Sequence, residues 1–300
     1  MTDWDVLVVG RSYAGLSAAL VLGRSRRSVL VIGSGGPRNE SVFHAHGLIT
    51  RDGAAPAELI AAAESELSKY PTVELVDARV TDIASLEGGG VRFGFGGHRS
   101  TAGSVILATG ANDNPPDTPG LVEHWGRGVF TCPYCDGFEH ADTHLAVTGA
   151  AAFAPHLARV LTGWSDRITV FHDGLDDAER TDLLAHGVHV EERAVARVVG
   201  DGSSVRAVQL DDGTDVPIGA LFLAQLPVPN NALAVQLGCA VDDNGHVVTD
   251  AMKCTTVPGV WAVGDVASAR SNMAMGIADG ALAAFACNAM LLDRAWAAGT

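Results

Sequence analysis

Two cysteines separated by two residues carry the clearest chemistry in this sequence. Cys132 and Cys135 enclose Pro133 and Tyr134. Two sulfurs at this spacing can form a reducible disulfide, and a helix start at the pair would lower the pKa of one thiol and make it a better nucleophile. Pro133 favours such a helix start. Asp136 follows directly and can exchange a proton with a leaving thiolate or interact with the helix dipole, so we predict a redox-active pair with Asp136 as its acid.

Zinc binding and a purely structural role are the alternatives for this pair. A zinc site needs a second pair of Cys or His ligands at suitable spacing. His140 and His144 lie downstream, but the sequence contains no second Cys-x-x-Cys. We therefore predict no metal. The other three of the five cysteines stand alone, which is not the pattern of a secreted disulfide framework.

Composition and charge exclude several classes of function. The chain has 300 residues, 47% of them hydrophobic, 35 glycines and a formal charge of −15. This acidity argues against nucleic acid, because phosphate binding needs clustered Lys and Arg. The N-terminus enters an apolar strand without a basic region, and we read no apolar stretch as approaching the roughly 20 residues of a membrane span. We expect a cytoplasmic protein without a membrane segment.

The elements that must position the cysteines follow a strand–turn–helix–strand order that occurs twice. The first unit has strands at 5–10 and 28–32 around a helix at 16–22, and the second repeats this order over 144–171. Proline-rich segments at 112–120 and 225–230 separate the parts. This order predicts an α/β protein with two Rossmann-like nucleotide-binding domains in three-layer ββα form.

The turn after the first strand is a candidate phosphate site. It reads Gly10-x-Ser12-x-x-Gly15, with serine in place of the second glycine, between a strand and a helix. A helix N-terminus directs free N–H groups at a pyrophosphate. An acidic residue should end the second strand and bind ribose, but Gly33 and Ser34 stand there. Either Ser34 or a backbone group substitutes, or the adenosine end is held differently; a unit that binds no nucleotide also stays open.

The sequence resembles the low-molecular-weight thioredoxin reductase family of FAD-dependent pyridine nucleotide-disulfide oxidoreductases. The redox centre at 132–137 is similar to the CxxCDG of that family, and the N-terminal turn and the blocks at 108–111 and 260–266 match in the same order. The resemblance implies a discontinuous FAD domain, 1–114 and 244–300, interrupted at 115–243 by an NAD(P)-binding-like domain that carries the CxxC. It also implies a homodimer, with Cys135 nearest the flavin and Cys132 meeting the outside thiol.

The same resemblance implies the residues that bind FAD. Asp265 would bind the ribityl chain, Met273 and Ala274 would lie near the isoalloxazine, and a loop at 44–53 would contact the cofactor. The full expected set is Gly10, Ser12, Tyr13, Ala14, Gly15, Ser34, Arg38, Asn39, His46, Thr50, Ala108, Thr109, Gly110, Gly264, Asp265, Met273 and Ala274.

The second nucleotide turn departs from the family pattern of GxGxxA/G followed by arginines that bind the 2′-phosphate. The segment 149–154 keeps only Gly149, and Asp173, Asp176 and Asp177 stand where arginines are expected. Carboxylates repel phosphate, so this turn counts against NADPH.

We therefore expect an enzyme closest to the dithiol oxidase subgroup (gliotoxin- and holomycin-type), which would oxidise a small-molecule dithiol with O2 as acceptor. That subgroup often has histidine after the second cysteine, whereas Asp136 is of the reductase type. Two alternatives stay open. One is a reductase of a thioredoxin-like protein disulfide fed by NAD(P)H, ferredoxin or another flavin, and the other is a non-enzymatic flavin redox sensor.

Overall fold

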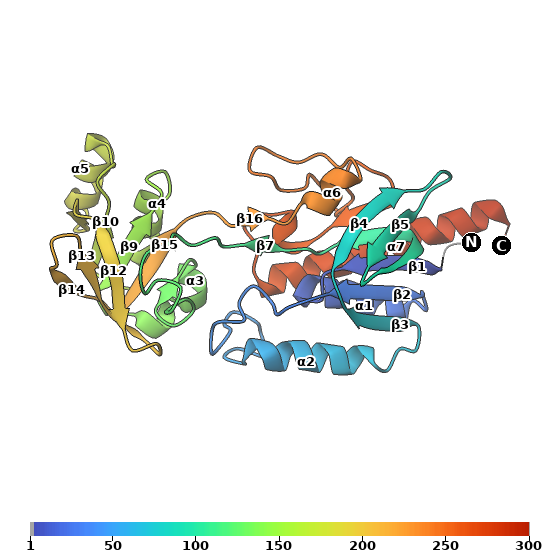
Figure 1. Ribbon diagram of the computed structural model, residues 1–300, viewed down its shortest axis with the longest axis horizontal. Helices are drawn as coiled ribbons and strands as arrows, with labels where there is room; N and C mark the ends of the chain where they lie inside the picture. The colour runs from blue at the N-terminus through green and yellow to red at the C-terminus, as the bar shows by residue number, and fades with distance from the viewer. Residues whose placement is uncertain (1–2, 300) are drawn as a thin grey trace. The chain divides into compact units, whose positions relative to one another are not determined.

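The computed structural model describes residues 3–299 and divides into two compact units (Figure 1). Unit 1 comprises Met1–Glu40, Pro56–Asn112 and Pro227–Thr300, and unit 2 comprises Ser41–Ala55 and Asp113–Leu226. The chain passes from unit 1 to unit 2 after Asn112, close to the expected boundary at 114. It returns to unit 1 at Pro227, well before the expected boundary at 243, and the segment 41–55 groups with unit 2.

A seven-stranded sheet forms the centre of unit 1. Its parallel strands, in spatial order, are β3 (Val73–Asp77), β2 (Val29–Gly33), β1 (Trp4–Val9), β6 (His98–Leu107) and β17 (Val260–Ala262). The antiparallel strands β5 (Val91–Phe95) and β4 (Val80–Ser85) continue from the first half of β6. The carboxyl ends of the parallel strands share one edge, where ligands bind in folds of this kind.

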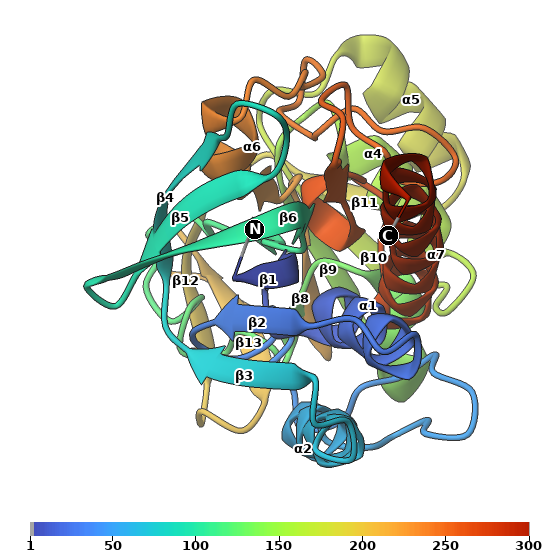
Figure 2. The same ribbon diagram turned by 90° about the vertical axis from the view of Figure 1, so that its right-hand side faces the viewer.

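The alternation of β1 explains the two layers that cover this sheet. Val6 and Val8 pack with α1 (Tyr13–Arg24) and α7 (Met273–Ala298), while Leu7 and Val9 pack on the other face. All four side chains are buried, as expected for a strand with a cover on each side. The helices α1 and α7 lie against each other (Figure 2), and α2 (Pro56–Leu67) and α6 (Ala232–Gln236) are the remaining α-helices among the described residues of this unit.

Unit 2 has a parallel sheet covered by helices on one face and by a small antiparallel sheet on the other. The parallel strands, in spatial order, are β11 (His189–Glu191), β10 (Ile168–Phe171), β9 (Leu145–Gly149), β15 (Ala220–Ala224) and β8 (Val129–Phe130). The antiparallel strands are β12 (Val195–Gly200), β13 (Val205–Leu210) and β14 (Asp215–Pro217). The helices are α3 (Pro133–Asp136), α4 (Ala154–Leu161) and α5 (Asp177–Ala185). Two Rossmann-like units in layered α/β form confirm the predicted fold class.

The connections between the units run through a short two-stranded sheet. β7 (Ala111–Asn112) pairs antiparallel with β16 (Val228–Pro229), so both crossing segments are hydrogen-bonded to each other.

The last helix corrects the expectation about apolar length. Within residues 3–299, α7 is the one helix long and apolar enough to span a membrane by length and composition. We expected glycines to interrupt the apolar stretches, but α7 continues through Gly276 and Gly280. Both glycines are buried, and a Cβ at Gly280 would overlap the Ala14 carbonyl of α1. One face of α7 packs on α1, and 28% of its most apolar stretch is buried.

Candidate functional site

The two cysteines of the motif form a disulfide in unit 2. Cys132 and Cys135 are bonded, with 5.3 Å between their Cα atoms. Cys132 is the N-cap of α3 and Pro133 is its first residue, as predicted, and the Cys135 and Asp136 N–H groups donate to the Cys132 carbonyl. The helix has only four residues, so a full macrodipole is absent.

Asp136 directly follows Cys135 and is in a desolvated position. Burial, followed by the negative charge of Glu139, raises the pKa of Asp136 to about 7, and the nearby His46 partly opposes this rise. A carboxyl with this pKa exchanges its proton near neutral pH, which is what an acid catalyst for a thiol requires. The structure therefore gives Asp136 the protonation behaviour that the predicted role needs.

The segment 41–55 supplies an imidazole to this neighbourhood. His46 Nε2 lies 3.4 Å from Glu139 Oε1, and its Nδ1 lies 3.5 Å from Asp52 Oδ2. His46 and Thr50 were expected to contact FAD, and their unit also holds the cysteine pair. Their role toward the cofactor stays a prediction. Glu139 was missed by sequence reasoning, because a surface glutamate three residues after Asp136 carries no signal of its own.

In unit 1 the first nucleotide turn has a backbone that only glycine allows. Gly10 has φ +121°, and a Cβ there would overlap the Ala108 carbonyl oxygen at the end of β6. A Cβ at Gly15 would overlap the Gly10 carbonyl oxygen. Ser12 is the N-cap of α1, and among the described residues its side chain makes no capping hydrogen bond. The N–H groups of this first turn, Tyr13, Ala14 and Gly15, are therefore available to a phosphate.

Five expected cofactor residues, far apart in the chain, make contacts with one another in and beyond this turn. Tyr13 Oη donates to Asn39 Oδ1 (3.4 Å), and Asn39 Nδ2 lies 3.7 Å from Met273 Sδ. Arg38 Nη1 lies 3.1 Å from Asp265 Oδ2. Ala274 follows Met273 in the first turn of α7 and is exposed. Ser34 is exposed in the turn after β2, and its side chain makes no hydrogen bond to another described residue. Its expected role in binding stays a prediction.

The ends of β6 and β17 are held by polar contacts that the sequence did not reveal. Thr109 Oγ1 donates to the Asn230 carbonyl (2.7 Å), and the Asn230 N–H donates to the Gly110 carbonyl (2.9 Å). Asp279 Oδ2 accepts from the Gly264 N–H (3.3 Å) and pairs through Oδ1 with Lys253 Nζ (2.7 Å). Asn230, Asp279 and Lys253 were missed, since their partners lie far away in sequence.

The second nucleotide turn keeps the first glycine alone. Gly149 has φ +122° and lies against the Ala224 backbone at the end of β15, as Gly10 lies against Ala108. The turn is longer than the first, because α4 begins only at Ala154, and partly exposed Phe153 precedes it. After β10, Asp176 caps α5 and forms a capping box with Glu179, so carboxylates occupy this edge of unit 2. In residues 3–299 no group of three or more His, Cys, Asp or Glu side chains could hold a metal ion.

Comparisons with known proteins agree with this arrangement. The family model for pyridine nucleotide-disulphide oxidoreductases matches residues 4–294, and the chain belongs to that family. It is 32% identical to thioredoxin reductase tcpT of Claviceps purpurea, over 96% of this chain and 94% of that one. The structure of HlmI has a TM-score of 0.95 at 36% identity, covering 99% and 95% of the two chains. That of an oxidoreductase from Agrobacterium tumefaciens has a TM-score of 0.90 at 38% identity, covering 97% and 99%.

The protein is therefore a thioredoxin reductase-like, FAD-dependent disulfide oxidoreductase, and the predicted family is confirmed. The family implies FAD, and the donor set of unit 1 fits it. The first turn of α1 offers N–H groups to a pyrophosphate, and no side-chain cap within the described residues occupies them. We assign the FAD site to this turn together with Arg38, Asn39 and Asp265 as a prediction.

Proposed function

We propose that the protein oxidises a small-molecule dithiol to a disulfide through Cys132 and Cys135, with FAD and O2, and does not depend on NADPH. The second nucleotide turn carries this proposal. Its backbone lacks the glycines that let a pyrophosphate approach, and Phe153 stands at the helix start. Carboxylates replace the guanidinium groups that would bind a 2′-phosphate.

The chemistry begins with the disulfide. A substrate thiolate attacks Cys132 Sγ, the Cys132–Cys135 bond breaks, and Cys135 leaves as a thiolate. Asp136, whose pKa is raised to about 7, gives its proton to that sulfur. The second thiol of the substrate then attacks the substrate sulfur that is bonded to Cys132. The substrate leaves as a disulfide, and both cysteines are left reduced.

Reoxidation of the pair balances the reaction. FAD supplies a two-electron acceptor when bound, and O2 takes those electrons with two protons to give hydrogen peroxide. In this step the Asp136 carboxylate is the base that removes protons from Cys132 and Cys135. The substrate loses two electrons and two protons in total.

Reduction of a thioredoxin-like protein disulfide is the second candidate, and Asp136 favours it because this residue is of the reductase type. The same residues would work in the opposite direction, with electrons from NAD(P)H, ferredoxin or another flavin. A flavin redox sensor without turnover is a third candidate. A cytoplasmic location and a homodimer also remain proposals, based on the cysteine pattern and on the family resemblance.

An anaerobic titration separates these candidates. The purified protein is mixed in turn with NADPH, NADH and dithiothreitol while the flavin absorption is followed. We expect bleaching by dithiothreitol alone, and one peroxide for each dithiol when air is admitted. Rapid bleaching by NADPH would overturn the oxidase proposal and support the reductase. Bleaching by the dithiol without catalytic turnover in air would favour the sensor.

Matched cysteine variants test the assignment of the pair. Cys135→Ser should abolish bleaching by dithiothreitol, whereas Cys254→Ser, at a half-buried lone cysteine, should leave it unchanged. If Cys135→Ser bleaches as fast as the wild type, the dithiol assignment is wrong.

A further inference from the structure

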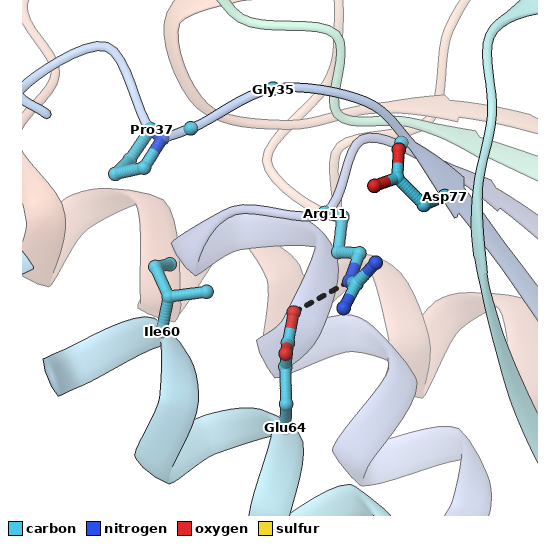
Figure 3. Close-up of a pocket in the computed structure, with 8 residues that line it drawn as sticks. Arg11, Gly35, Pro37, Ile60, Glu64 and Asp77 are labelled. Carbon is cyan, nitrogen blue, oxygen red and sulfur yellow. Dashed lines mark hydrogen bonds and ion pairs between the residues drawn. The ribbon is translucent and has the colours of Figure 1, made fainter. Parts of the chain in front are cut away.

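A cavity in unit 1 lies where the second and third strands end. It has a volume of about 170 Å³ and is lined by the turn 35–37, by Ile60 and Glu64 of α2, and by Arg11 and Asp77 (Figure 3). Gly33 and Asp77 are register partners at the carboxyl ends of β2 and β3. In a dinucleotide fold this is the position of the acidic residue that binds ribose, and β2 ends in Gly33 instead.

The backbone and Cβ of Arg11 occupy the space that a side chain at residue 33 would need. A Cβ on Gly33 would lie 2.6 Å from the Arg11 Cβ and 2.5 Å from the Arg11 backbone nitrogen. Both contacts are closer than real Cβ atoms allow. One is with a Cβ that any residue except glycine has, and the other is with the backbone nitrogen, so an acid at residue 33 requires a glycine at residue 11 and a shift of the turn. The absence of an acid at residue 33 is therefore linked to the non-glycine residue in the turn.

The Arg11 guanidinium is held in a defined orientation at the cavity. Its Nε lies 2.5 Å from Glu64 Oε1, and Figure 3 shows the two side chains meeting across the cavity wall, with Asp77 on the far side of the guanidinium. Among the described residues, no hydrogen-bond acceptor engages its two Nη atoms, so their donors remain available. The Arg11 and Glu64 side chains are about one quarter exposed.

We propose that Arg11, oriented by Glu64, binds the adenosine ribose of FAD in place of the acid that normally ends β2. A guanidinium carries five donors and no acceptor, so the ribose hydroxyls would accept hydrogen bonds here instead of donating them. Glu64 and Asp77 keep the net charge of the cavity negative. A ribose carrying an extra phosphate is therefore disfavoured. The inference extends the proposed function and rests only on FAD as the cofactor of the family.

The experiment measures dissociation constants of FAD and FMN for the full-length chain after flavin removal. FMN lacks the adenosine half, so it reports on the rest of the site. Arg11→Gly should weaken FAD about tenfold to hundredfold, the range for a hydrogen bond to a charged group, and leave FMN unchanged. Arg79→Gly, at an exposed arginine of the same unit, should change neither constant. The thermal midpoints of the flavin-free proteins check folding.

The reverse exchange completes the test. Gly33→Asp alone should weaken FAD strongly, and the double variant Arg11→Gly/Gly33→Asp should recover at least tenfold of that loss, because glycine at residue 11 removes one overlap and frees the turn to shift from the other. Equal losses for FAD and FMN in Arg11→Gly, an unchanged FAD constant, or a double variant no better than Gly33→Asp would overturn the inference. If Gly33→Asp does not fold, the FAD and FMN comparison in Arg11→Gly decides. A wild type that binds FAD but oxidises no dithiol would overturn the proposed function alone.

Discussion

Replacing Asp136 with asparagine should remove a large pH dependence of the stability of this protein between about pH 4 and pH 7. The pKa of Asp136 rises from its ordinary 3.8 to about 7 on folding, because the folded chain buries it near Glu139. In this pH range the folded state holds a proton that the unfolded state has released, so the free energy of unfolding falls as the pH rises. At 1.36 kcal/mol per pH unit, the total loss is about 4 kcal/mol.

Asparagine is neutral at every pH and similar in shape, so Asp136→Asn should match the wild type near pH 4 and exceed it by up to about 4 kcal/mol at pH 8. Urea unfolding of flavin-free protein at pH 4, 5, 6, 7 and 8 measures this difference. Asp117→Asn, at an exposed carboxylate of the same unit, serves as the control and should follow the wild type. Parallel curves for the wild type and Asp136→Asn from pH 4 to pH 8 would refute the assigned burial effect.

Three further outcomes follow from the same contacts. Glu139→Gln removes the negative neighbour of Asp136 and should lower its pKa, so the stability loss should level off at a lower pH in the same urea series. Gly10→Ala forces a side chain into a backbone at φ +121° and should cost at least about 1 to 3 kcal/mol from that conformation alone. Because the overlap with the Ala108 carbonyl should displace the turn, the variant should purify with little flavin, measured as the ratio of flavin to protein absorbance, and full flavin content would contradict the assignment of FAD to this turn. Asp279→Ala leaves Lys253 without its partner in a largely buried position and should destabilise unit 1 by about 3 kcal/mol, measured by the same unfolding assay; an unchanged midpoint would show that solvent replaces the pair.

Local secondary structure was predictable because hydrophobic runs and glycine positions specify it. The strand at 5–10, the turn around Gly10 and the helix after it occur as expected, and so does the helix start at Pro133. These features depend on residues adjacent in sequence, whose backbone preferences and hydrophobic pattern can be read from the amino-acid sequence.

Contacts between distant residues were not predictable from one sequence. The grouping of 41–55 with the cysteine unit depends on contacts such as His46 with Glu139, and the second crossing at Pro227 depends on the pairing of β16 with β7. The length of α7 was misjudged because its glycines look like interruptions, whereas they allow close packing on α1. Arg11 received no role from the sequence, since nothing in it pairs this residue with Gly33 or Glu64.

Gly10 and Gly149 adopt nearly the same backbone angle and each lies against the end of a neighbouring parallel strand. That contact is made within the protein and would be needed whether or not a nucleotide occupied the turn. The first glycine of such a motif therefore reflects a packing requirement of the strand crossing and is by itself no evidence of a ligand. A search that counts this glycine as evidence of a nucleotide therefore counts a residue that the fold itself requires.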